Sequence, residues 1–133
     1  MHHKERALDD FRLQLSTLHD AIRHARFLTD AFFARLTTEA MYLRSIAERH
    51  RIIFYLGHLE AFDWNLLGTR VFFQPPIHPT FEQLFAFGID PVDGNLPTDV
   101  PSDWPELQVV SAFCAQIRAT LDAQGRLSGE LRG

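Results

Sequence analysis

Apolar residues recur every three or four positions from Leu8 to Leu36, and no glycine or proline interrupts the series. Its members are Leu8, Phe11, Leu15, Leu18, Ile22, Ala25, Thr29, Phe32 and Leu36. Alternating spacings of three and four place these side chains in one stripe along a helix of about four heptads. We therefore expect a long amphipathic helix over 4–35. Because such a helix buries its stripe against other helices, the pattern favours an all-α fold.

Two further stretches carry the same period, and Pro- and Gly-rich segments separate them. We expect helices over 48–70 and 105–123, with a short helix over 81–87 capped by Thr80 and ended by Gly88. No convincing strand pattern is present in the sequence. The fold class predicted is an antiparallel up-and-down bundle of three long helices and one short helix, in a single domain over 1–133. The apolar pattern is lost after 123, so 124–133 is expected to be a frayed tail.

The second long stretch is the most apolar part of the chain. On a helix, one broad stripe would be formed by Ile52, Tyr55, Leu56, Leu59, Phe62 and Leu66. Leu59 lies at the centre of this stripe and Glu60 about 100° away, so Leu59→Ala is expected to destabilise the fold far more than Glu60→Ala. Gly57 interrupts the stripe at a cost of about 1 kcal/mol, which suggests that a partner helix approaches closely there.

Composition excludes several classes of protein. With 133 residues, 46% hydrophobic and 23% charged, the chain is long and apolar enough for one folded core. Its net charge of −4 gives no basic footprint for nucleic acid, and no charge-free window is long enough for a transmembrane helix. A lone cysteine, Cys114, excludes an intramolecular disulfide and fits a reducing, cytoplasmic location. No nucleotide-binding, zinc-cluster or nucleophile motif is present, so no catalytic or cofactor-binding residue is assigned.

His58 is the residue whose surroundings are most unusual, at the edge of an apolar stripe. One interpretation is a boundary histidine bonded to a backbone group or a carboxylate. The other is a metal ligand, since a neutral imidazole suits zinc, iron, copper or nickel. No histidine has another four residues away, so no single helix offers a two-histidine clamp. His50, in the polar first turn expected for the 48–70 helix, is interpreted as solvated, and Asp63 as an acid that pairs with an arginine such as Arg70.

The segment Tyr55-Leu-Gly-His-Leu-Glu-Ala-Phe-Asp-Trp64 resembles the WHLGH segment of DinB-like four-helix bundles, in particular the N-terminal domain of ergothioneine-biosynthesis sulfoxide synthases. Segments 81–88 and 102–105 resemble the next part of the chain in that branch, and the resemblance covers roughly residues 40 to 123. It implies a bundle whose interior binds iron or another divalent metal through three histidines, the first of which matches His58. The other two belong to an HxxxH motif on the family's last helix, and this sequence contains no such motif.

The resemblance therefore implies a relative that lacks the last family helix and the formylglycine-generating-enzyme-like domain found downstream in complete members. Three hypotheses are open. The chain is a metal-site domain that is not catalytically competent alone and holds no stoichiometric metal; or it is a non-catalytic helical module that acts through self-association or partner binding; or it binds a small molecule in its aromatic-rich interior. An uncovered apolar face favours a homo-oligomer, with a dimer as the commonest closed form. No nucleic-acid or membrane partner is expected.

Overall fold

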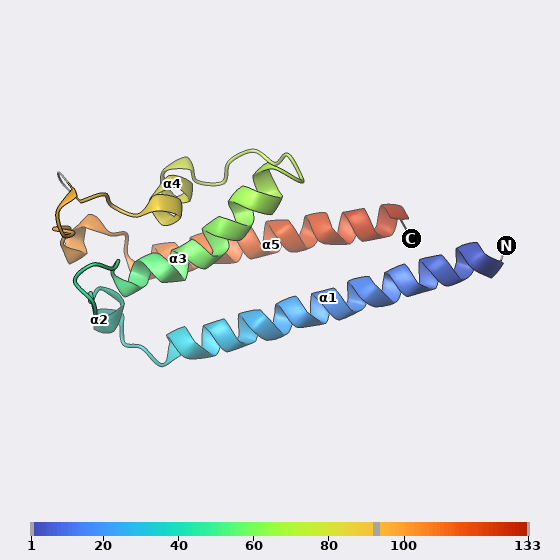
Figure 1. Ribbon diagram of the computed structural model, residues 1–133, viewed down its shortest axis with the longest axis horizontal. Coiled ribbons are helices and arrows are strands. Elements are labelled where there is room, and N and C mark those ends of the chain that lie inside the picture. The colour runs from blue at the N-terminus through green and yellow to red at the C-terminus, as the bar shows by residue number, and fades with distance from the viewer. Residues whose placement is uncertain (1, 92–93, 133) are drawn as a thin grey trace. The chain divides into compact units, whose positions relative to one another are not determined.

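The computed structural model describes residues 2–91 and 94–132, with side chains through residue 125, and it is all-α (Figure 1). Its helices are α1 (His2–Ala34), α2 (Thr38–Met41), α3 (Ile52–Asp63), a π-helix (Trp64–Thr69), α4 (Pro79–Phe87), a 3-10 turn (Pro101–Asp103) and α5 (Leu107–Arg132). No strand occurs among the described residues. The predicted all-α helical bundle is confirmed.

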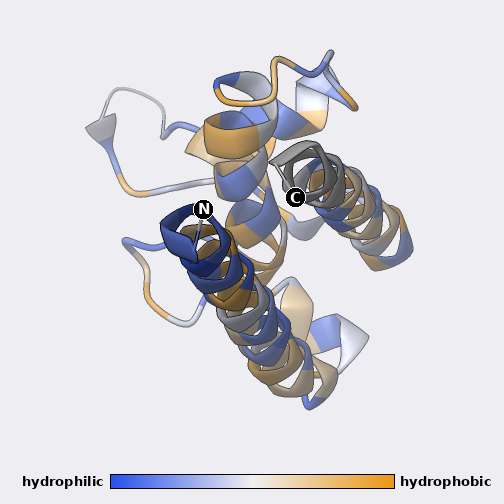
Figure 2. Ribbon diagram, turned by 90° about the vertical axis from the view of Figure 1, so that its right-hand side faces the viewer, coloured by the Kyte–Doolittle hydropathy of each residue, from blue (hydrophilic) through white to orange (hydrophobic). Residues whose placement is uncertain are grey.

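Two compact units divide the chain, Met1–Arg35 with Ala123–Gly133, and Leu36–Asp122. Because compact units are not by themselves independent domains, the single domain over 1–133 stays a prediction. In the first unit, α1 covers nearly all of the predicted 4–35 helix, and Figure 2 shows hydrophobic and hydrophilic residues alternating along it. None of the residues of α1 is buried. No described helix has the length and hydropathy needed to span a bilayer.

The second unit is built around α3, which begins four residues later than predicted and continues into the π-helix. Gly68 makes room for the Trp64 ring on this segment, since a Cβ there would lie 2.6 Å from Cζ3 of Trp64. The core of the unit contains Met41, Ile53, Phe54, Ala61, Trp64, Phe85, Trp104, Val110, Phe113, Cys114, Ile117 and Leu121. Side chains from α3, α4 and α5 thus share one core, together with Trp104 from the loop that precedes α5.

The predicted buried face of α3 is wrong. Leu59, at the centre of the predicted stripe, is 45% exposed, whereas Glu60 is only 6% exposed. The residues buried along α3 and the π-helix are Ile53, Phe54, Gly57, Glu60, Ala61, Trp64 and Gly68, while Tyr55, Leu59, Phe62 and Leu66 are exposed. Gly57 and Ala61 are small, so neighbouring helices can approach this side closely. Glu60 tolerates burial because Arg118 on α5 donates to it across 2.7 Å.

The ends of α4 and α5 also differ from the prediction. The side chain of His78, rather than Thr80, caps α4 by accepting from the Phe81 N–H at 3.1 Å. Helix α5 begins at Leu107 instead of 105, and its first backbone hydrogen bonds run from Val109 and Val110 to the Glu106 carbonyl. The predicted end of the last helix at 123 is wrong, because α5 continues through both Gly125 and Gly129 to Arg132, while the frayed tail over 124–133 stays a prediction. A glycine inside a helix costs only about 1 kcal/mol and does not have to end it. Gly133 lies outside the described residues.

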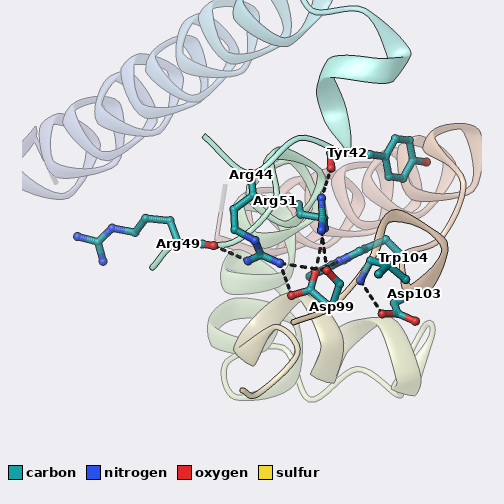
Figure 3. Close-up of polar contacts among 8 residues, drawn as sticks. Tyr42, Arg44, Arg49, Arg51, Asp99, Asp103 and Trp104 are labelled. Atoms are coloured by element: carbon teal, nitrogen blue, oxygen red, sulfur yellow. Dashed lines mark hydrogen bonds and ion pairs between the residues drawn. The ribbon is translucent and has the colours of Figure 1, made fainter. Parts of the chain in front are cut away.

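A buried carboxylate anchors the loop between α4 and α5. Asp99 accepts hydrogen bonds from Arg44, from Nε of Arg51 at 3.0 Å and from the indole N–H of Trp104 at 2.7 Å (Figure 3). Its side chain is 3% exposed. Burial alone would raise the pKa of Asp99, but the hydrogen bonds from Trp104 and Arg44 and the charge of Arg44 outweigh it and hold this pKa below its ordinary value. This network fixes the loop against the segment that leads into α3.

Candidate functional site

His58 lies on α3 with its ring half-buried, and α4 determines how the ring is held. Its Nδ1 is 2.6 Å from the backbone carbonyl oxygen of Phe85. A carbonyl oxygen only accepts, so Nδ1 must carry the proton and donate. In the neutral imidazole the lone pair then resides on Nε2. A backbone carbonyl that orients a histidine through one nitrogen is the usual support for a metal-binding imidazole.

The close approach of α4 depends on Gly57. A Cβ at this position would lie 2.5 Å from Cγ of Phe85, far inside van der Waals contact. The Phe85 ring is completely buried against this glycine, and its carbonyl thereby reaches the next residue of α3, His58. The expectation that Gly57 admits a partner helix therefore agrees with the structure, and α4 is that partner.

Aromatic rings fix the plane of the His58 imidazole. Rings at intervals of four residues follow one another along α3 and the segment before it, with centroid separations of 4.0 Å for His50–Phe54, 4.9 Å for Phe54–His58 and 6.3 Å for His58–Phe62. The interplanar angle of 23° between Phe54 and His58 is a stacked arrangement. The imidazole is thus restrained both by a hydrogen bond in its plane and by a ring against its face.

The interpretation of His50 as solvated agrees with the structure only in part, because the residue is partly buried. Its ring is tilted against the Phe54 ring, and a Cβ at Gly88 would lie 2.7 Å from its Nδ1. Burial lowers the pKa of His50, and the positive charges of Arg44 and His58 lower it further. The negative charges of Asp99 and Asp90 raise this pKa, but the net shift is downward. The four-residue spacing of rings at 50, 54, 58 and 62 is a sequence signal that could have identified this residue.

The donor groups near His58 do not complete a metal site. Within the described part of the chain, no group of three or more His, Cys, Asp or Glu side chains is arranged to hold a metal ion. Asp63 is exposed, and the Cys114 thiol is buried and lies 3.6 Å from the Leu56 carbonyl oxygen. Nδ1 of His78 is occupied by the cap of α4. The chemistry of His58 fits a metal ligand, but these residues supply only that one suitable donor.

Two buried acids, which sequence reasoning missed, serve the packing of the unit. Glu60 pairs with Arg118, and Glu82 accepts from the Trp64 indole and from the His78 N–H at 2.8 Å. Both carboxylates therefore link helices. An open cavity of about 370 Å³ lies elsewhere, along α4 and the residues after it. Its lining consists of Thr80, Gln83, Leu84, Phe87, Gly88 and Asp90, so it includes neither His58 nor the buried aromatic core.

Comparison with known proteins gives one informative similarity. The chain is similar to ergothioneine biosynthesis protein 1 of Neurospora crassa. The two are 30% identical over 92 residues, which is 65% of this chain and 10% of the relative. The chain thus spans about a tenth of the length of that relative. No family model matches the sequence, and no solved structure matches it.

Proposed function

We propose that this chain forms a DinB-like helical module related to the metal-binding N-terminal domain of ergothioneine-biosynthesis sulfoxide synthases. In this module His58 supplies one metal ligand, and ligands from a second copy of the chain or from additional sequence in a longer protein complete the site. The observation that carries the proposal is the hydrogen bond from Nδ1 of His58 to the Phe85 carbonyl, which leaves Nε2 as the donor atom. The similarity to the Neurospora protein supports the relation to that family.

The same geometry limits what the chain does alone. Catalytic metal sites usually use about three protein ligands and structural ones about four. One imidazole competes poorly with water and buffer, so we assign no catalytic step to this chain. The metal expected from the resemblance is iron, or another divalent ion with affinity for imidazole. Further ligands would come from a second copy of the chain or from additional sequence in a longer protein.

Metal titration tests this proposal directly. The metal-free chain is titrated with Co²⁺, whose absorption bands report nitrogen ligands, and bound metal is counted after equilibrium dialysis. We expect well under one equivalent at micromolar concentrations, with the residual binding lost in His58→Ala. His24→Ala is the matched control, since His24 is exposed on α1 and should leave binding unchanged. One tightly bound equivalent that survives His58→Ala would refute the role of this residue.

A second candidate is a non-catalytic module that acts through self-association. The observation that favours it is the apolar surface of α3 and the π-helix, where Tyr55, Leu59, Phe62 and Leu66 are between 36% and 58% exposed. Large exposed apolar patches commonly mark interaction sites. This candidate predicts a dimer or larger assembly by light scattering at micromolar concentration, reduced to a monomer by Phe62→Asp. A monomeric wild-type chain would rule it out under those conditions.

A further inference from the structure

The Phe85 carbonyl is available to His58 because of where α4 ends. Carbonyls in the last turn of a helix have no intrahelical donor. Gly88 ends α4 with a φ of +76° and donates to the Leu84 carbonyl, so Phe85 belongs to this last turn. His58 approaches from α3 and donates through Nδ1 at 2.6 Å. A basic side chain at a helix carboxyl end is also favoured by the helix dipole.

We propose that Gly57 and Phe85 are positioning residues that lock His58 in the Nδ1–H tautomer and present Nε2 as its donor atom. The use of Nε2 for a metal rests on the proposed function, whereas the tautomer lock does not. The lock has two parts. The empty space over Gly57 accepts the Phe85 ring, and the seated Phe85 places its own carbonyl opposite Nδ1. The second part depends on the first, because α4 can bring the Phe85 carbonyl to Nδ1 only where the side chain at position 85 fits against residue 57.

The tautomer is informative because a neutral histidine in water prefers the opposite form, with the proton on Nε2. The hydrogen bond made by one ring nitrogen decides which form a protein holds. His78 provides an internal reference in the same unit. Its Nδ1 accepts from the Phe81 N–H at 3.1 Å, so neutral His78 must carry its proton on Nε2. The two histidines should therefore occupy opposite tautomers in one sample.

Long-range ¹H–¹⁵N correlation spectra of the full chain test the proposal, recorded about two pH units above the ordinary histidine pKa so that the rings are neutral. We expect His58 to give the Nδ1–H pattern and His78 the Nε2–H pattern. Gly57→Ala should displace Phe85 and shift the His58 tautomer ratio toward Nε2–H by about five-fold or more, the effect of losing one ordinary hydrogen bond. The His78 pattern should persist in that variant.

A rescue variant separates positioning from general damage. In Gly57→Ala/Phe85→Leu the smaller leucine side chain leaves space for the methyl group added at position 57. We therefore expect α4 to pack against α3 again and the Nδ1–H form of His58 to return. Phe85→Leu keeps the backbone carbonyl in any case. If the spectra of the wild-type chain show the Nε2–H form of His58, the proposal is overturned. This measurement does not depend on the folding of any variant. A folded Gly57→Ala that keeps the wild-type tautomer overturns it as well.

The NMR spectra test the tautomer of His58 and the Co²⁺ titration tests its role as a metal ligand, so the failure of one proposal can be told from the failure of the other. If His58 shows Nδ1–H and Co²⁺ binding is insensitive to His58→Ala, the lock stands and the metal role fails. If His58 shows Nε2–H while binding depends on His58, the metal role stands and the lock fails.

Discussion

Glu60→Ala should destabilise the fold more than Leu59→Ala, which reverses the order expected from the apolar stripe. The two residues are neighbours on α3, and the structure gives them opposite environments. The Glu60 side chain is 7% exposed and accepts from both Nε and Nη2 of Arg118 at 2.7 Å. Leu59 is 45% exposed. The comparison therefore tests which face of α3 is buried.

The magnitudes follow from these environments. Breaking a fully buried ion pair by removing one partner costs about 3–5 kcal/mol. The Arg118 side chain is 23% exposed and can turn partly to water, so we expect about 2–3 kcal/mol for Glu60→Ala. A fully buried Leu→Ala change costs about 2–5 kcal/mol, largely because it leaves a cavity. Leu59 lies half in water and leaves no closed cavity, so about 1 kcal/mol or less is expected.

Urea unfolding followed by far-UV circular dichroism measures both changes. With a slope of about 1–3 kcal/mol per M, Glu60→Ala should lower the midpoint by about 1 M or more and Leu59→Ala by much less. Glu60→Gln should be intermediate, since it keeps an acceptor for Arg118 but no charge. A double-mutant cycle with Arg118→Ala should show coupling between the two positions. The urea midpoints are measured at two protein concentrations. Equal midpoints for the two variants, or a lower midpoint for Leu59→Ala, at both concentrations would refute the assignment of the buried face.

Two further predictions concern the junction between α3 and the end of α4. Gly88→Ala should lower the thermal midpoint more than Gly94→Ala: both glycines have positive φ, but a Cβ at Gly88 would meet His50 whereas one at Gly94 would have no neighbour within 4 Å. Stability should also fall as the pH drops below 6.5 toward the lowered pKa of His50, because the unfolded chain then binds a proton that the folded chain resists. His50→Gln should remove this part of the pH dependence, and a profile that overlays the wild type would contradict the assignment.

The helices were predictable because their signal is local. A period of 3.6 residues defined α1 almost to its ends, and Gly88 marked the end of α4 as expected. The start of α5 was misplaced by two residues, because its first hydrogen bonds run to the carbonyl of Glu106. The end of α5 was misplaced because glycine weakens a helix without necessarily ending it.

The buried face of α3 was not predictable from periodicity, since apolar residues surround most of this helix. The face is decided by which side fits the partners, and Gly57 and Ala61 offer the closest approach. Glu60 is buried only because Arg118 lies opposite, 58 positions away in sequence. The hydrogen-bond partner of His58 could not be predicted from the sequence either, because any type of residue can supply a backbone carbonyl such as that of Phe85.

Four consecutive residues of α3 illustrate how strictly this segment depends on its register. Gly57 admits the Phe85 ring, His58 donates to the Phe85 carbonyl, Leu59 faces outward, and Glu60 pairs with Arg118. Each step turns about 100° around the helix, so a slip of one residue would bring His58 under the Phe85 ring and Leu59 opposite the carbonyl. The Phe85 ring would then clash with the His58 side chain, and the Phe85 carbonyl would lose its hydrogen-bond donor. The presentation of His58 therefore depends on the packing of α3 against α4 as much as on the histidine itself.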